Sequence, residues 1–113
     1  MNIDALVRER ITPELVNAFR RDGAVCVRQL LSPEEVALLR EGIDANLAAP
    51  SPRAKVASRP GDPGFFIEDF CNWNRLPAME RFIRASPGAE IAAELTGSDT
   101  IRLYHDHVLV KEP

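Results

Sequence analysis

The sequence lacks any long hydrophobic run and contains few cysteines. No apolar stretch approaches the roughly 18–20 residues that span a bilayer, and the start, Met1-Asn2-Ile3-Asp4, has an early acid instead of the apolar region of a signal peptide. The two cysteines do not form a CxxC pair and are too few for a disulfide scaffold. We therefore predict a reduced, cytoplasmic protein with no membrane partner.

Basic clusters and common catalytic motifs are missing as well. The chain has 14 Lys and Arg against 17 Asp and Glu, a net charge of −3, so we do not expect nucleic acid as a partner. No GxGxxG, Walker, GxSxG or HExxH motif occurs. The hydrophobic share of 45% and charged share of 27% are typical of a folded soluble chain, and 113 residues predict a single domain over 1–113.

Helix starts are marked by proline after a capping residue. Thr12 and Pro13 predict a helix that ends at Gly23, because threonine caps the first turn, proline suits the first helical position, and glycine adopts the left-handed stop. Ser32 and Glu35 form the sequence pattern of a capping box before apolar residues at helical spacing. Two further helices are predicted to begin at Leu76-Pro77 and Ser86-Pro87, the second ending at Gly97.

Three segments are predicted to be strands, so the predicted fold class is α+β. Residues 24–31 are short, rich in valine and bounded by turn signals, with Cys26 expected to be a small buried hydrophobe. Residues 65–70 form a second candidate, and residues 100–111 a long third one. The Pro- and Gly-rich segment 50–64 predicts a long irregular loop, either functional or merely solvated. The aromatic residues of 65–73 are more typical of a core than of a ligand cage.

Both histidines lie in the last predicted strand. Alternation along a strand puts His105 and His107 on one face with Leu109 and Lys111, and Asp106 on the other face. A site of two histidines and one carboxylate needs all three ligands to converge, which Asp106 cannot do on a regular strand. We therefore assign no metal ligand. A metal held by the two histidines, or histidines that only make hydrogen bonds, stay open as alternatives.

Several segments together resemble the phytanoyl-CoA dioxygenase family. The resemblance covers almost the whole chain in order and rests on Phe19, the segments Asp22-Gly23-Ala24-Val25 and Leu30–Val36, Trp73, Pro77, Ser86-Pro87, and Arg102–Pro113. It implies iron(II)- and 2-oxoglutarate-dependent oxygenases on a double-stranded β-helix, which hydroxylate a small organic substrate. This chain would then contain the N-terminal helices and first strands of that jelly-roll fold.

The resemblance also implies a limited set of site residues. In that family the iron ligands, a His-x-Asp motif and a distant histidine, follow the Lys-Glu-Pro segment, and this sequence ends at Pro113 before them. We therefore expect an incomplete N-terminal fragment that is inactive alone and binds neither iron(II) nor 2-oxoglutarate tightly. His107 is implied as the main contact of 2-oxoglutarate, Lys111 as a weaker candidate, and Trp73 as a neighbour of the substrate. A lysine used by some relatives near Phe65 is absent.

Two other functions stay open. The chain could be a non-catalytic binding or interaction module derived from such an enzyme, which self-associates through exposed sheet edges. It could also be a small metal-binding protein that uses His105 and His107.

Overall fold

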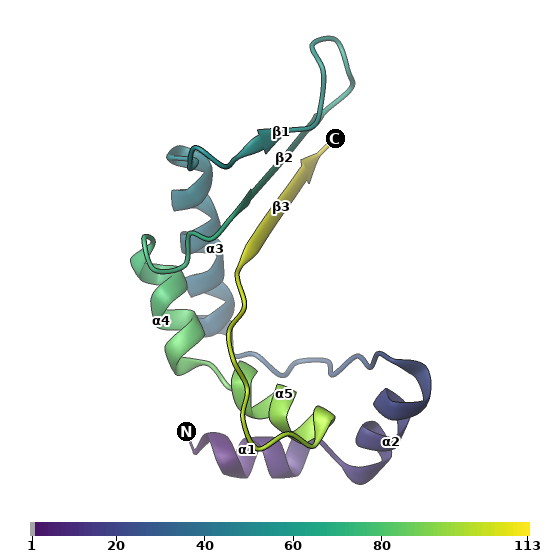
Figure 1. Cartoon of the computed structure of the whole chain (residues 1–113). Coiled ribbons are helices and arrows are strands. Elements are labelled where there is room, and N and C mark those ends of the chain that lie inside the picture. Colours follow the sequence, from purple (N-terminus) through teal and green to yellow (C-terminus); the bar gives the residue numbers. More distant parts are fainter. Residues whose placement is uncertain (1) are drawn as a thin grey trace. The chain divides into compact units, whose positions relative to one another are not determined.

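The computed structural model describes residues 2–113 and shows five helices and three strands within them (Figure 1). This confirms the predicted α+β class. Contacts divide the chain into two compact units, each built from two segments. The first unit contains the residues up to Ser32 together with Ala85–Leu103, and the second contains Pro33–Arg84 together with Tyr104–Pro113. None of the helices described is both long and apolar enough to cross a bilayer.

The first unit is helical. It contains α1 (Ile3–Arg10), α2 (Pro13–Asp22) and α5 (Gly88–Thr96), and α5 packs against both of the others. The predicted boundaries of α2 are confirmed, because Thr12 Oγ accepts a hydrogen bond from Leu15 N at 3.3 Å and Gly23 adopts a φ of 78°. Gly97, with a φ of 70°, likewise ends α5 as predicted. Helix α1 was not predicted from the sequence, since Asn2 caps it without a following proline.

The predicted strand over 24–31 is wrong. These residues form irregular backbone with a turn, in which Gln29 has a φ of 55°. The Arg10 guanidinium donates hydrogen bonds to the carbonyls of Arg28 and Gln29 at 2.6 and 3.3 Å, so a side chain satisfies groups that a strand would direct to a neighbour. Cys26 is exposed, not buried as predicted, because the segment has no sheet to pack in.

The second unit combines two helices with a small sheet. Helices α3 (Pro33–Ala48) and α4 (Pro77–Ala85) accompany strands β1 (Lys55–Val56), β2 (Phe65–Phe70) and β3 (His107–Glu112). The sheet order is β1-β2-β3, and both pairs are antiparallel (Figure 1). In the longer pair, Phe70 lies opposite His107 and Phe66 opposite Lys111.

One face of this sheet carries the core of the unit. Val108 on β3 packs with Leu76 and Met79, all at least 92% buried, and Leu39 and Ile43 of α3 pack against this group. Gly42 allows this close approach of helices, because a Cβ at that position would lie 2.7 Å from Met79 Cγ. The sheet is therefore covered by α3 and α4 on the side of Val108.

Two predicted segments differ from the structure in extent. The last strand begins at His107 and not at residue 100. Its partner strand β2 ends at Phe70, because Cys71, with a φ of 61°, turns the chain away from β3. The alternation of faces within 107–111 is confirmed, with Val108 buried and Leu109 exposed. The predicted irregular loop 50–64 contains strand β1, whose two residues pair with β2.

Candidate functional site

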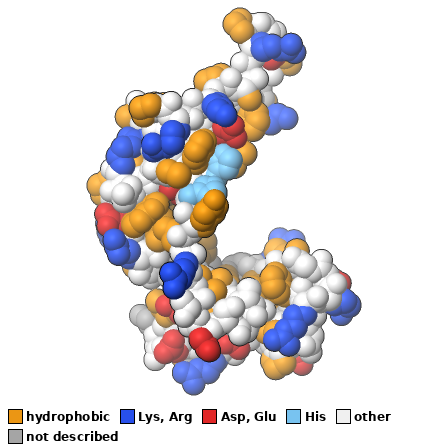
Figure 2. Space-filling view, viewed as in Figure 1, with side chains coloured by type: hydrophobic (Ala, Val, Ile, Leu, Met, Phe, Trp, Pro, Cys, Tyr) orange, Lys and Arg blue, Asp and Glu red, His pale blue; other side chains and the backbone are white. Residues whose placement is uncertain are grey.

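The face of the sheet opposite Val108 is a candidate functional surface. Directly paired residues of antiparallel strands share a face, so the register brings β2 and β3 side chains together there. Figure 2 shows the two histidines next to one another, with hydrophobic side chains around them. We call this surface the open sheet face; its residues are Phe66, Glu68, Phe70, His107, Leu109 and Lys111.

His107 is held in place by two neighbours. Its Nε2 lies 3.1 Å from Glu68 Oε2, and its ring meets the Phe70 ring edge-on, with centroids 5.6 Å apart. A carboxylate only accepts hydrogen bonds, so Nε2 carries the proton and donates it. The Nε2–H group of His107 is thus already used in the contact with Glu68.

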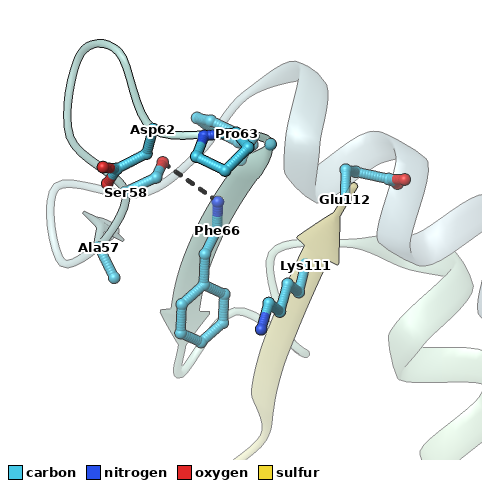
Figure 3. Close-up of a pocket in the computed structure, with 9 residues that line it drawn as sticks. Ala57, Ser58, Asp62, Pro63, Phe66, Lys111 and Glu112 are labelled. Carbon is cyan, nitrogen blue, oxygen red and sulfur yellow. Dashed lines mark hydrogen bonds between the residues drawn. The ribbon is translucent and has the colours of Figure 1, made fainter.

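Lys111 lies four residues further along the same face and lines a cavity. The cavity has a volume of about 260 Å³ and is bounded by residues 57–58, 62–66 and 111–112. Figure 3 shows the Lys111 side chain beside the Phe66 ring, one strand across. Among residues 2–113 Lys111 has no ion pair, so its ammonium is available to an anion. This volume is slightly below the range of small-ligand pockets, about 300–1,000 Å³.

Local backbone geometry shapes this cavity. Phe66 N donates a hydrogen bond to Ser58 Oγ at 3.2 Å, which ties the loop to β2 (Figure 3). Gly64 has a φ of 87°, and a Cβ there would collide with the backbone carbonyl of Glu112. Only glycine therefore lets the chain pass so close to the end of β3.

Trp73 lies away from the open sheet face. It is half-buried and packs against the core group that contains Val108, on the other side of the sheet. The Arg84 guanidinium carbon lies 5.4 Å from the centroid of the Trp73 ring, a cation–π contact. The structure thus brings His107 and Lys111 to one face and does not place Trp73 with them.

His105 lies near His107 although it precedes the strand. The two ring centroids are 6.3 Å apart, and the Tyr104 ring lies 4.7 Å from that of His105. Within the described part of the chain, no group of three or more His, Cys, Asp or Glu side chains is arranged to hold a metal ion. Glu68 lies beside His107, but it does not form such a group with the two histidines.

Asp106 has a structural role that the sequence did not reveal. Its carboxylate accepts hydrogen bonds from Asn72 N at 2.9 Å and Trp73 N at 3.0 Å, and its carbonyl accepts one from Cys71 N at 3.1 Å. These bonds satisfy the turn after β2, where Cys71 adopts its positive φ. The carboxylate is thus used within the fold.

A buried polar cluster stabilises the covered side of the sheet. Asp69 is 3% exposed and accepts hydrogen bonds from the Ser51 amide and hydroxyl at 2.7 and 2.6 Å and from Asn46 Nδ2 at 2.9 Å. Burial raises the pKa of Asp69, but the hydrogen bonds from Ser51 and Asn46 outweigh burial and hold this pKa well below its usual range. Asp69 therefore joins α3 and the following loop to β2 as a carboxylate.

Two arginine side chains donate hydrogen bonds to backbone carbonyls beside this cluster. Arg53 donates to the carbonyls of Phe70 and Cys71 at 3.0 and 2.9 Å, and Arg75 donates to Ala49 O at 3.0 Å. Neither the two arginines nor the Asp69 cluster is predicted from the sequence. Their partners are mainly backbone carbonyls and distant residues, so no local pattern marks them.

Comparison of the chain with protein-family models, with curated proteins and with solved structures gives no match.

Proposed function

We propose that the chain is the N-terminal part of an iron(II)- and 2-oxoglutarate-dependent dioxygenase of the kind that the sequence resembles, the phytanoyl-CoA dioxygenase family. One observation carries the proposal. An antiparallel sheet is covered by helices on one face and presents aromatic, basic and histidine side chains on the other. In a double-stranded β-helix, such a sheet contributes one wall of a pocket for cosubstrate and a small organic substrate.

Within this wall, Lys111 is the stronger candidate for a carboxylate of 2-oxoglutarate. Its ammonium has no ion pair among the described residues and borders the cavity, whereas His107 already donates to Glu68. Four residues of strand separate the two by about 13 Å, so one small dicarboxylate touches one of them. Nε2 of His107 can donate to a carboxylate of 2-oxoglutarate only when Glu68 turns away.

The residues present do not fit an iron site. Asp106 is engaged by two backbone amides, and Glu68, the carboxylate beside His107, does not form a metal-binding group with the two histidines among the described residues. The family resemblance implies that the iron ligands of the proposed enzyme follow the Lys-Glu-Pro segment, and no reaction step is assigned to this chain. Trp73 borders the substrate only if the substrate reaches the core side of the sheet.

A titration with 2-oxoglutarate, followed by NMR of the amides, tests the cosubstrate contact. We expect millimolar binding, with shifts confined to 57–66 and 107–112, and about tenfold weaker binding by Lys111→Ala, since about 1.4 kcal/mol corresponds to tenfold. Lys55→Ala is the matched control, because Lys55 is an exposed lysine opposite Glu68 on the same sheet. Equal effects of the two variants would contradict a specific site at Lys111.

Two measurements test the family itself. The purified chain with iron(II) and 2-oxoglutarate is expected to release no succinate, and turnover would refute the assignment of the iron ligands to other residues. Sequencing the gene beyond the codon for Pro113 is the second measurement. A His-x-Asp motif in the same reading frame supports the proposal, and its absence there contradicts it.

A further inference from the structure

The outer edge of β3 has no strand partner within residues 2–113. The sheet order is β1-β2-β3, so β3 pairs with β2 alone and its other side is an edge (Figure 1). An edge strand presents a row of backbone amide and carbonyl groups that can pair with another strand. The residues of β3 that direct these backbone groups to the outer edge determine which strand can pair with it.

The hydrogen bonds around β2 identify those residues. Cys71 N donates to Asp106 O at 3.1 Å, so Asp106 turns its backbone groups toward the β2 side. Antiparallel pairs alternate between bonded and non-bonded positions, so Val108 and Val110 also turn theirs inward. Their neighbours His107, Leu109 and Lys111 therefore direct their amides and carbonyls to the free edge.

The other side of β2 supports the same alternation. Phe66 lies opposite Lys111, yet its amide donates to Ser58 Oγ and its carbonyl accepts from Ala57 N at 2.8 Å. Both groups of Phe66 point away from β3. Lys111 is thus a non-bonded partner of β2, as the alternation requires.

The sequence of β3 is nearly symmetric about Leu109. A valine lies on each side of it, and a polar residue, His107 or Lys111, lies beyond each valine. Antiparallel pairing of two copies about a two-fold axis at Leu109 places Leu109 opposite itself and Val108 opposite Val110 of the other copy. The two residues of every pair then lie on the same face of the sheet. A shift of the register by one residue would instead pair residues of the covered face with residues of the open sheet face.

We propose that β3 pairs with β3 of a second copy of this chain, antiparallel and centred on Leu109, to form a continuous six-stranded sheet. The outward groups of Leu109 make the central pair, in which each amide donates to the other carbonyl. The valines of both copies extend the covered face, and both leucines extend the open sheet face. This inference concerns the chain of residues 1–113 and does not depend on the proposed enzymatic function.

Self-complementarity favours a second copy over an unrelated strand. The three central residues of the edge are apolar, and the charged side chain of Lys111 stands at the end, opposite His107 of the other copy. Protected edges usually carry a charge or a proline in the middle. Leu109 is 56% exposed and fills that middle position with a hydrophobic side chain.

Analytical ultracentrifugation over a concentration series tests the dimer. We expect a monomer–dimer equilibrium for the whole chain and at least a tenfold higher dissociation constant for Leu109→Lys, which would place two lysines opposite each other. Val56→Lys is the control, since Val56 is also 56% exposed but lies on β1 at the other edge. It should dimerise like the parent chain. A parent chain that stays monomeric, or equal effects of the two variants, would overturn the proposal.

Cross-linking tests the register and does not depend on the lysine variant remaining folded. In a background with Cys26→Ser and Cys71→Ser, oxidation of Leu109→Cys by copper phenanthroline in air should join two chains. Bonded antiparallel pairs have Cα atoms about 5.5 Å apart, within disulfide reach. Lys111→Cys is the control, because its two copies lie about 13 Å apart and should not cross-link. Failure of Leu109→Cys to cross-link, or equal cross-linking at both positions, would overturn the register.

Discussion

The two faces of one small sheet differ in almost every physical respect. On the covered face, Val108 is 8% exposed within an apolar core, and Asp69 is buried with several hydrogen bonds. On the open sheet face, the side chains next to them in sequence, Leu109 and Glu68, contact solvent or other exposed groups. Adjacent residues of the same strand thus lie in opposite environments, one buried in the core and the other open to solvent.

This difference lets single substitutions test the buried face and the exposed face separately. Substitutions on the covered face should change the free energy of unfolding, and those on the open sheet face should change binding or association. Pairs of neighbouring positions therefore supply their own controls.

The largest effect is expected for Asp69→Asn. The variant places an amide against the Ser51 and Asn46 donors and loses the charge they stabilise, so we expect about 3 kcal/mol lower stability. Urea denaturation followed by circular dichroism measures it. Glu68→Gln, one residue away on the open sheet face, should change stability by less than about 0.5 kcal/mol. Similar losses in both variants would remove the distinction between the faces.

A smaller loss is expected for Val108→Ala, which removes two methyl groups from the core beside Leu76 and Met79. The lost burial and the cavity left behind should cost about 2 kcal/mol. Leu109→Ala should cost less than about 0.5 kcal/mol when measured at concentrations where the chain is monomeric. Thermal melts of both variants make the comparison, and a reversed order would show that the faces are wrongly assigned.

The next largest effect is expected from acid, which should lower the free energy of unfolding through Asp69 on the covered face. The pKa of Asp69 is lower in the folded chain than the ordinary value of about 3.9, so the unfolded state takes up the proton first as pH falls. The stabilisation is complete above about pH 5 and declines by about 1 kcal/mol per pH unit below about pH 4. Denaturation midpoints at several pH values measure the slope. Glu68→Gln should keep this component of the slope and Asp69→Asn should lose it.

The smallest effect is expected for the pair of His107 and Glu68 on the open sheet face. Their side chains are 38% and 29% exposed, so solvent screens the interaction and the coupling should be about 0.3–0.5 kcal/mol. A double-mutant cycle with alanine at each position measures it. A coupling above about 2 kcal/mol would mean that this face also contributes substantially to stability.

The sequence predicted the elements whose signals are local. Caps and stops such as Thr12, Gly23 and Gly97 act within a few residues, and their helices formed where expected. The alternation that separates Val108 from Leu109 was also predicted, because it needs only a strand with one covered face.

The failures arose where a distant partner decides the conformation. Residues 24–31 have the composition of a strand, but Arg10 binds their carbonyls and no neighbouring strand is available among the described residues. The site was predicted only in part: His107 and Lys111 share a face as expected, whereas the bond of His107 to Glu68 joins residues far apart in sequence. Side-chain pairs of that kind leave no periodic signal.

The order of the strands along the chain has a consequence for synthesis. β1 and β2 are close in sequence and can pair as soon as both leave the ribosome, but β2 must then wait until α4, α5 and their connections have been made before β3 arrives. During that interval the second edge of β2 is exposed, and closing the long intervening loop is the slow, entropically costly step. Nascent chains paused between Phe70 and His107 would therefore be the most vulnerable to aggregation.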